Sequence, residues 1–562
     1  MIRGFINQVA INPNMVKVLV EGEINDEYIA TLHKFDAQLD FVSQDVENEE
    51  LHVTTSEVKA VKEVRSDLNI LKSQCGARVR DYLLGIVHKI TAESNLEELQ
   101  NSELLGTAEI MLFLKKHIPK TFEEIKRQYV GLVKEIMMNR VKSYRELYQN
   151  RGNSSPIACS RTKPPSGTPK IRSCVVRSFL KKKVFLGFHE YGVEGFGLEN
   201  RGDVLNHLED PPILVEPLQE GDDPDLDFPV CYRSLIKVMT DSALAEFSFV
   251  KAFFHAEDSA VFNEIFRDVC KYLQTQTLEW CANSVDFVGV LLVAMLIQSI
   301  VTRLQSREFP VLIDFWLPLR DKVLARFAAI LEKHAGAAKT AQTQVKSMNI
   351  TEQLHYAMKR YACMAGAILA LGEKYPEFLP DRSKWEQPLD GLTAEVMTLM
   401  QKMSECVVED RQMEYCFNTL CYILQQWKDL GVTVTKGEVY ELFEKYVVEF
   451  LDSVMAEHMS FLYEFVKKNE NKKGSHLKLS SNEMKGLKRY KEGFKDDIKE
   501  MNDAIHAKVE NYALEVYKAF VKQVSDYHTK YIQILGGTSF VKELVPVKHV
   551  VNEAMQYSAQ YE

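Results

Sequence analysis

Two small groups of residues carry side chains that could do chemistry, and packing accounts for both. His355 lies in a helical pattern beside Tyr356, where a hydrogen-bonded core or boundary histidine is a more common outcome than a metal ligand. Cys416 and Cys421 lie five residues apart on a predicted helix, so their side chains point along diverging faces. We expect both thiols to pack as small buried hydrophobes.

The motifs that mark common active sites are missing from the sequence. It contains no HExxH pair, no P-loop, no Cys/His zinc spacing and no GxSxG elbow. The glycines Gly192, Gly195, Gly197 and Gly202 have the wrong spacing for a dinucleotide fingerprint and follow no strand. The sequence therefore predicts no catalytic, cofactor-binding or metal-ligating residues. Catalytic groups are recognised by geometry rather than by order, so an enzyme stays an alternative that a buried cluster of titratable side chains would support.

A basic segment near the C-terminus is the strongest charge feature. Lys467–Lys495 holds ten Lys and Arg against three Glu, at the joint between two expected helices. Such a segment can contact acidic phosphoinositide head groups, and a solvated joint between helices is the alternative. No aromatic residues are interleaved in a way that suggests stacking on bases. The candidate membrane-contact residues are Lys472, Lys473, Lys485, Lys488 and Arg489.

Composition narrows the class of protein. The 562 residues are 46% hydrophobic and 26% charged, which is ordinary for a globular chain and excludes disorder throughout. A net charge of −10 disfavours generic binding to nucleic acid. Ten scattered cysteines without a CxxC pair indicate a reducing compartment, and no signal peptide is evident. The most apolar run, Phe287–Ile297, is too short to span a bilayer and predicts a helix buried on all sides.

The clearest N-terminal pattern runs from Val58 to Ile90, where apolar residues recur every three or four positions. It predicts a helix of about 35 residues and about 50 Å, with a coiled-coil seam from Val61 to Cys75. A single small domain would not cover so long a stripe. We therefore expect it to bind helices of partner chains, and burial in this chain's own core is an equally weighted alternative. The residues concerned are Val61, Val64, Leu68, Leu71, Cys75 and Val79.

Helical periodicity also dominates the rest of the chain. A second helix is expected over Thr121–Tyr148, with Thr121 as N-cap and Glu124 completing a capping box. Apolar steps of three and four from about Leu487 to Leu535 predict a last rod about 70 Å long. A loop is expected to begin near Gly336. The other expected helices are Pro229–His255, Ser259–Asn283, Val285–Ser306, Val311–His334, Thr351–Glu373, Leu392–Leu430 and Lys436–Lys468.

A compositional break divides the chain. Nine of the 17 prolines fall between Pro156 and Pro229. Arg151–Lys183 carries nine Lys and Arg and no acid, whereas Glu190–Asp227 carries twelve Asp and Glu and a single arginine. Such a segment cannot bury enough apolar area to order itself. We expect an N-terminal helical, coiled-coil region over 1–150, a disordered basic-then-acidic insertion over 151–228, a middle helical bundle over 229–375 and a C-terminal bundle over 376–562.

Several short motifs occur in the order and spacing of one known family. The motifs are Asn14–Val42 with its Glu21–Asn25 turn, Val79–Leu83, Ile125–Tyr148, Phe196–Arg201 followed by Val204 and Leu205, and Phe228–Phe254. With them, the chain resembles the vacuolar protein sorting-associated protein 52 family over nearly its whole length. Family members usually carry a further coiled coil before this part, and the resemblance here begins almost at Pro13. We therefore expect a short member or assembly through another segment.

The resemblance implies a subunit of the Golgi-associated retrograde protein complex, which tethers endosome-derived vesicles at the trans-Golgi network, or of a related endosomal recycling complex. It implies, as partners, the other subunits, Rab- or Arf-like small GTPases and SNAREs, with peripheral membrane contact and no nucleic acid. The expected location is the cytosolic face of the trans-Golgi network and endosomes. It implies no catalytic residues.

These observations together predict an all-α protein, an elongated rod of stacked helical bundles with an N-terminal coiled-coil-like helix. The expected function is that of a non-enzymatic scaffold in vesicle tethering. Two alternatives stay open: an exocyst-type tether, whose helical rods look alike at this level, and a lipid-binding peripheral membrane protein that uses Lys467–Lys495.

Overall fold

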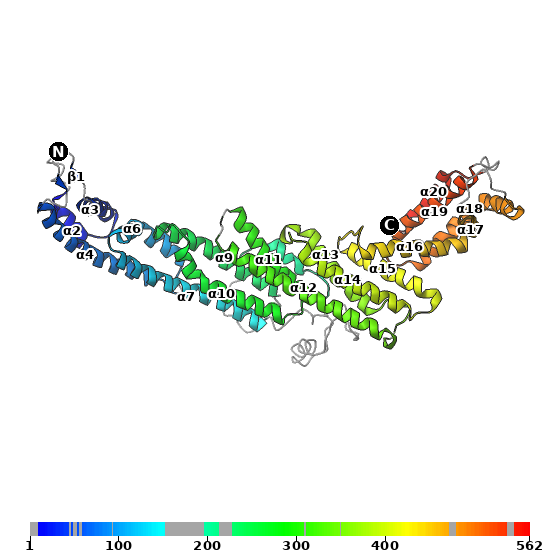
Figure 1. Cartoon of the computed structure of the whole chain (residues 1–562), viewed down its shortest axis with the longest axis horizontal. Coiled ribbons are helices and arrows are strands. Elements are labelled where there is room, and N and C mark those ends of the chain that lie inside the picture. The colour runs from blue at the N-terminus through cyan, green and yellow to red at the C-terminus, as the bar shows by residue number, and fades with distance from the viewer. Residues whose placement is uncertain are drawn as a thin grey trace. The chain divides into compact units, whose positions relative to one another are not determined.

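The computed structural model describes residues 9–43, 47–48, 53–54, 59–92, 94–151, 196–212, 228–307, 309, 311–348, 350–470, 479–536 and 544–561. Helices make up almost all of this part of the chain (Figure 1). Its one sheet is a short antiparallel hairpin of β1 (Glu47–Asn48) and β2 (Val53–Thr54). The prediction of an all-α chain of helical bundles is confirmed.

The chain forms two compact units, each assembled from separated segments. The first comprises Met1–Arg151, Leu208–Trp280 and Ile300–Leu319, and the second comprises Gly152–His207, Cys281–Ser299 and Arg320–Glu562. The insertion predicted over 151–228 lies outside the described residues, apart from its two ends and residues 196–212. Whether the remainder is disordered stays a prediction.

The first unit is a bundle in which the N-terminal helices pack on α4. Its helices are α2 (Pro13–Glu21), α3 (Asp26–Ser43), α4 (Lys59–Val87), α5 (Leu96–Leu99), α6 (Ala108–His117), α7 (Pro119–Arg151), α9 (Phe228–Phe253) and most of α10 (Ala260–Asn283), with a π-helical turn η2 (Gln100–Leu104) and a 3-10 turn η3 (Leu105–Thr107). Helix α4 contacts α2, α3 and α7, and α7 contacts α9. Asn12 caps α2 by accepting a hydrogen bond from the Asn14 backbone N–H at 2.9 Å.

Helix α7 begins at Pro119 and not after a Thr121 cap, so that prediction is wrong. Proline suits the first turn of a helix because its missing N–H would have no intrahelical acceptor there. Glu124 is also not part of a capping box. Its carboxylate binds the Arg80 guanidinium of α4, with Arg80 Nε 2.8 Å from Glu124 Oε2. Glu124, expected to cap the start of a helix, thus joins two helices instead.

The second unit is a chain of helices in which neighbours in sequence pack against one another. Its helices are α13 (Tyr356–Lys374), α14 (Ser383–Ser404), α15 (Gln412–Asp429), α16 (Glu438–His458), α17 (Ser460–Asn469), α18 (Ser481–Lys508), α19 (Ala513–Leu535) and α20 (Val547–Met555), with 3-10 turns η5 (Arg201–His207), η6 (Val345–Ser347), η7 (Pro376–Phe378), η8 (Glu409–Arg411) and η11 (Ser558–Gln560). Helix α15 packs on α13, α14 and α16, and α16 also contacts α17, α18 and α19.

Four predicted helices need correction. The helix expected over Lys436–Lys468 is two helices, α16 and α17, separated at Met459. Helix α12 (Ile313–Gln344) runs through Gly336, where a loop was expected. The helix expected over Leu392–Leu430 is two helices, α14 and α15, separated at residues 405–411. The last rod is also two helices, because the chain turns at Tyr512, whose φ of 57° lies in the left-handed region.

Helix α11 (Phe287–Ser306) is the one helix of the described chain that is long and apolar enough to cross a membrane by length and composition alone. Its apolar window is 89% buried within the protein. Val288, Leu291 and Met295 are fully buried, as a core helix requires. The prediction of a buried helix over Phe287–Ile297 is confirmed.

Candidate functional site

The stripe of α4 lies inside the first unit. Val61, Leu68, Leu71, Cys75 and Val79 are at most 4% exposed, covered by α2, α3 and α7. The premise of an uncovered seam is therefore wrong, and the alternative prediction of core burial describes these five residues. The physical reason is that this chain supplies its own covering helices. That they also contact a partner chain stays a prediction.

The cover over α4 is held by polar contacts as well as by apolar packing. The Tyr28 hydroxyl of α3 lies 3.2 Å from the Cys75 sulfur, and both side chains are buried. Arg78 donates to the Leu19 carbonyl at 3.2 Å, at the C-terminal end of α2 where carbonyl groups lack helical partners. Both contacts fix α4 against its neighbours, so α4 cannot be freed for another chain without losing them.

Two members of the stripe stay accessible, one toward each end of α4. Val64 is half-buried, and the Tyr82 side chain is 39% exposed. The steps of three and four in the Val58–Ile90 pattern also place Tyr82 on this stripe, whereas the structure buries Leu83 in its place. Because 18 residues make five helical turns, Val64 and Tyr82 lie on one line about 27 Å apart along the axis. The stripe is therefore buried up to its ends, at Val61 and Ile86, and Val64 and Tyr82 are two accessible positions within it.

The basic segment has a described part and an undescribed one. Lys472 and Lys473 lie outside the described residues. Lys485, Lys488 and Arg489 are exposed on α18. A capping box holds the start of this helix, in which Ser480 and Glu483 each bind the other's backbone N–H. Across the parts that the structure describes, the three cations form no ion pair, and Met484 beside them is 38% exposed.

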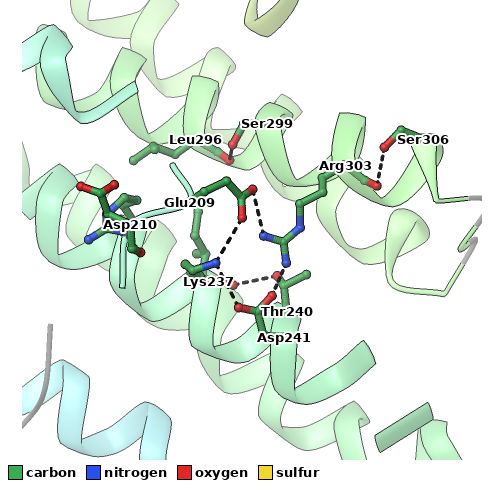
Figure 2. Close-up of polar contacts among 11 residues, drawn as sticks. Glu209, Asp210, Lys237, Thr240, Asp241, Leu296, Ser299, Arg303 and Ser306 are labelled. Carbon is green, nitrogen blue, oxygen red and sulfur yellow. Dashed lines mark hydrogen bonds and ion pairs between the residues drawn. The ribbon is translucent and has the colours of Figure 1, made fainter. Parts of the chain in front are cut away.

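Residues after Leu208 hold the chain to α9 in the first unit. Figure 2 shows Lys237 and Arg303 between the carboxylates of Glu209 and Asp241. The Lys237 ammonium lies 3.3 Å from Glu209 and 3.2 Å from Asp241, and Arg303 pairs with the same two carboxylates. Both cation side chains are largely buried while Glu209 is exposed. This four-membered network clamps the chain at Glu209, within the acidic part of the insertion.

The preceding residues are anchored separately in the second unit. The Arg201 guanidinium pairs in a bidentate manner with the Asp286 carboxylate, one contact being 2.9 Å, and both side chains are about one-tenth exposed. Val204 and Leu205 are buried, and the Tyr375 hydroxyl donates to Asn206 at 2.7 Å. The short stretch singled out in the sequence, Phe196–Arg201 with Val204 and Leu205, is therefore an ordered docked segment.

A buried carboxyl lies in the core of the first unit. Glu246 of α9 accepts hydrogen bonds from the Tyr129 hydroxyl at 2.7 Å and from Gln100 at 2.8 Å. Burial raises the pKa of Glu246 to about 7, against the lowering effect of those two hydrogen bonds. All three side chains are at most 4% exposed, so no substrate reaches them, and the network is structural rather than catalytic. No sequence pattern predicts this network, because one glutamate in an amphipathic helix looks like any other.

One group of side chains has the composition of a metal site. Asp36, Asp40 and His117 bring potential ligand atoms within 4.8 Å of one another. The Lys116 ammonium, however, lies 2.9 Å from Asp36 and also binds Asp40, while His117 Nε2 is 2.6 Å from Asp36. An ammonium group therefore balances the carboxylates already, and the arrangement is that of an ion-pair cluster between α3 and α6.

The isolated candidates are packing residues, as expected. His355 caps α13, with its Nδ1 accepting from the Ala357 backbone N–H at 3.2 Å. Burial, with a contribution from the charge of Arg360, lowers the pKa of His355 to about 4. Cys416 and Cys421 are free and buried.

Two family models match the sequence. The coiled-coil region of the Vps52/Sac2 family matches residues 1–114, and the Vps52 C-terminal region matches residues 189–448. Vacuolar protein sorting-associated proteins 52 A and 52 B of Arabidopsis thaliana are each 23% identical, covering 99% of this chain and 77% and 78% of their own lengths. A homologue from Caenorhabditis elegans is 18% identical, covering 83% of this chain and 66% of its own length.

Among solved structures, that of Exo70 from S. cerevisiae is similar, with 11% identity and a TM-score of 0.40, covering 99% of this chain and 98% of that one. The two matched regions of the family, and relatives that align along nearly the whole chain, agree with one another. The chain therefore belongs to the Vps52 family and is a non-enzymatic subunit of a multisubunit vesicle-tethering complex.

Proposed function

We propose that this chain is a scaffold subunit of the Golgi-associated retrograde protein complex and acts in transport from endosomes to the trans-Golgi network, with a related role in endosomal recycling. Its partners are the other subunits, Rab- or Arf-like small GTPases and SNAREs, and its location is the cytosolic face of those membranes. The observation that carries the proposal is the match of both family regions on one chain of helical bundles.

The mechanism combines several weak binding contacts on one long helical chain. Helical bundles hold separate binding surfaces at fixed places on one chain, so that the second contact forms at a high effective concentration once the first exists. No single surface then needs high affinity. A tether of this kind captures a membrane only when several partners are present together.

Affinity purification of the tagged chain from cells, with identification of the bound proteins, tests this function. We expect the other subunits of the retrograde complex in near-stoichiometric amounts, and a GTPase or SNARE in smaller amounts. Exocyst subunits in their place would overturn the proposal and support the exocyst-type alternative.

Val64 and Tyr82, the two accessible positions of the α4 stripe, are the proposed subunit contact. Because α2, α3 and α7 already cover the residues between them, a partner would contact each position separately. Changing Val64 and Tyr82 to Asp should reduce co-purification of the other subunits, because charge placed in an apolar contact must be desolvated. Val408→Asp, at a residue 66% exposed in the second unit, is the matched control. Unchanged co-purification with the double variant would refute this contact.

Membrane contact through α18 is a second candidate function. It is favoured by Lys485, Lys488 and Arg489, which are exposed and form no ion pair within the described chain, and by the exposed Met484 beside them. Each basic side chain near an anionic membrane surface contributes about 1 kcal/mol, and the contribution falls with salt.

Liposome flotation of the purified chain with phosphoinositide-containing vesicles separates the two functions. Changing the three cations of α18 to Gln should abolish flotation if the chain reads lipid by itself. The control changes Lys322, Lys333 and Lys346 to Gln, which removes the same charge from an exposed part of the second unit. No flotation of the wild-type chain without partner subunits would contradict the lipid function and leave the tether.

A further inference from the structure

A half-enclosed pocket in the second unit has no role in the fold described above. It measures about 410 Å³, which is within the range of sites that bind small ligands or side chains of a partner. Three segments form it: the docked stretch around Leu198, the C-terminal end of α13 and the turn that follows α15. All of its lining residues belong to the second unit.

The interior of the pocket is apolar. Leu198, Ala370, Leu371 and Val432 line it, together with Leu430, whose side chain is 41% exposed at its edge. A partner that covers Leu430 together with this apolar lining removes apolar surface from water. Burying Leu430 under a partner would therefore be favourable.

The rim of the pocket is acidic. Glu199, Asp203 and Glu373 stand around it against a single cation, Lys374. The Lys374 ammonium lies over the Tyr375 ring, 5.1 Å from its centre, so it is already engaged. Glu199 and Glu373 are exposed and have no cationic partner in the part of the chain that the structure describes. The rim thus presents carboxylates that a basic ligand would neutralise.

The backbone at the rim is held in an unusual conformation. Glu199 has φ of 46°, in the left-handed region that residues with a side chain rarely adopt. Such strain persists only where the surroundings fix it, and it often marks binding sites. Arg201, two residues later, is the anchor that fixes it through its bidentate pair with Asp286.

We propose that this pocket binds a short segment of another polypeptide in which a lysine or arginine is flanked by apolar residues. The apolar neighbours enter beside Leu430, while the basic side chain meets Glu199, Asp203 and Glu373. The acidic rim over an apolar interior selects this chemistry, because an acidic peptide would be repelled and a purely apolar one would leave the carboxylates unpaired. The inference rests on the proposed role as an assembly subunit, which requires contacts with other chains.

The test uses the purified full chain and the fluorescein-labelled peptide GSLRLSG, with binding followed by fluorescence anisotropy. Saturable binding is expected, with binding about tenfold weaker after Glu199→Lys together with Glu373→Lys, since these changes reverse the rim charge. Peptides with glutamate in place of arginine, or alanine in place of leucine, should bind the wild-type chain at least tenfold more weakly than GSLRLSG does. No saturable binding to the wild-type chain, or equal binding to the charge-reversed variant, would overturn the proposal. The chain alone is used, so failure here leaves co-purification with the other subunits unaffected.

Glu199→Gly separates binding from folding. Glycine adopts φ of 46° without strain, so the variant should unfold at the same temperature as the wild type or higher. Its peptide binding should nevertheless weaken, because one carboxylate of the rim is gone. Glu352→Gly is the control, at an exposed glutamate of the same unit that does not line the pocket. A stable Glu199→Gly variant that binds the peptide as well as the wild type would contradict the assigned role of the rim.

Discussion

Replacing Glu246 by glutamine is expected to stabilise the first unit at pH 8 much more than at pH 5. The side chain is 1% exposed and its carboxyl group lies between Tyr129 and Gln100, and no cation among the described residues balances its ionised form. Glutamine keeps the shape and stays neutral at every pH. Its amide can still accept from the Tyr129 hydroxyl, and a turn of the Gln100 amide gives its N–H group an acceptor.

The sign and size of this effect follow from the raised pKa. In the unfolded chain the carboxyl loses its proton near pH 4.5, whereas in the folded chain it keeps it until about pH 7. The folded state therefore binds more protons within this window, and the stability contributed by Glu246 falls as the pH rises through it. At about 1.4 kcal/mol for each pH unit, the loss between pH 5 and pH 8 amounts to about 2.5 kcal/mol.

Amide hydrogen exchange in α7 and α9 measures this effect without requiring the whole chain to unfold in one step. The opening free energies of variant and wild type are compared at pH 5 and again at pH 8, so that the intrinsic pH dependence of exchange cancels. We expect the gain from Glu246→Gln to be larger at pH 8 by about 2.5 kcal/mol. Glu264→Gln, at an exposed glutamate of α10, is the control and should change neither value. An equal gain at both pH values would refute the reasoning, since it would show that the buried carboxyl titrates normally.

Three further predictions concern packing. Asp286→Ala leaves the nearly buried Arg201 guanidinium without its carboxylate and should destabilise the second unit by about 3 kcal/mol. Urea unfolding measures this loss, and the double variant that also removes the Arg201 side chain is the comparison. Gly372→Ala places a methyl group 2.6 Å from the Trp385 ring and should cost about 1–3 kcal/mol, seen as a lower melting temperature. Leu68→Ala should lower the opening free energy of α4, measured by amide hydrogen exchange, by about 2–5 kcal/mol. If the stripe were left open for a partner, this free energy would hardly change in the isolated chain.

Periodicity predicted which α4 residues share a face but could not say what covers that face. Val61, Leu68, Leu71, Cys75 and Val79 do lie along one buried stripe. A three- and four-residue repeat has the same form whether the helix faces its own core or another chain. The covering helices come from segments before and after α4, and sequence spacing alone does not reveal those long-range contacts.

The same limit explains the rod expected at the C-terminus. The apolar steps continue across residues 509–512, yet Tyr490 near the start of α18 contacts His528 near the end of α19, with its hydroxyl 3.0 Å from the histidine ring. The chain therefore reverses between the two helices, and their apolar stripes are buried mainly against α16, α17 and α20 rather than along each other. Tyr512 makes the turn with positive φ, although glycine or asparagine is the usual signal for such a conformation. A chain reversal without that signal leaves the repeat unbroken.

Burial of these stripes bears on how the chain can act as a tether. Because α4, α18 and α19 use their apolar faces inside their own units, the described chain offers partners small surfaces such as Val64 and Tyr82 of α4, the cations of α18 and the rim of the pocket near Glu199. Small surfaces give weak contacts individually, since affinity depends on well-buried central residues. Linkage on one chain raises the effective concentration for each further contact, so the affinities multiply. A double variant at two surfaces should therefore weaken membrane capture far more than the sum of the losses caused by the two single variants. A double variant no weaker than one of the two single variants would instead indicate one dominant interface.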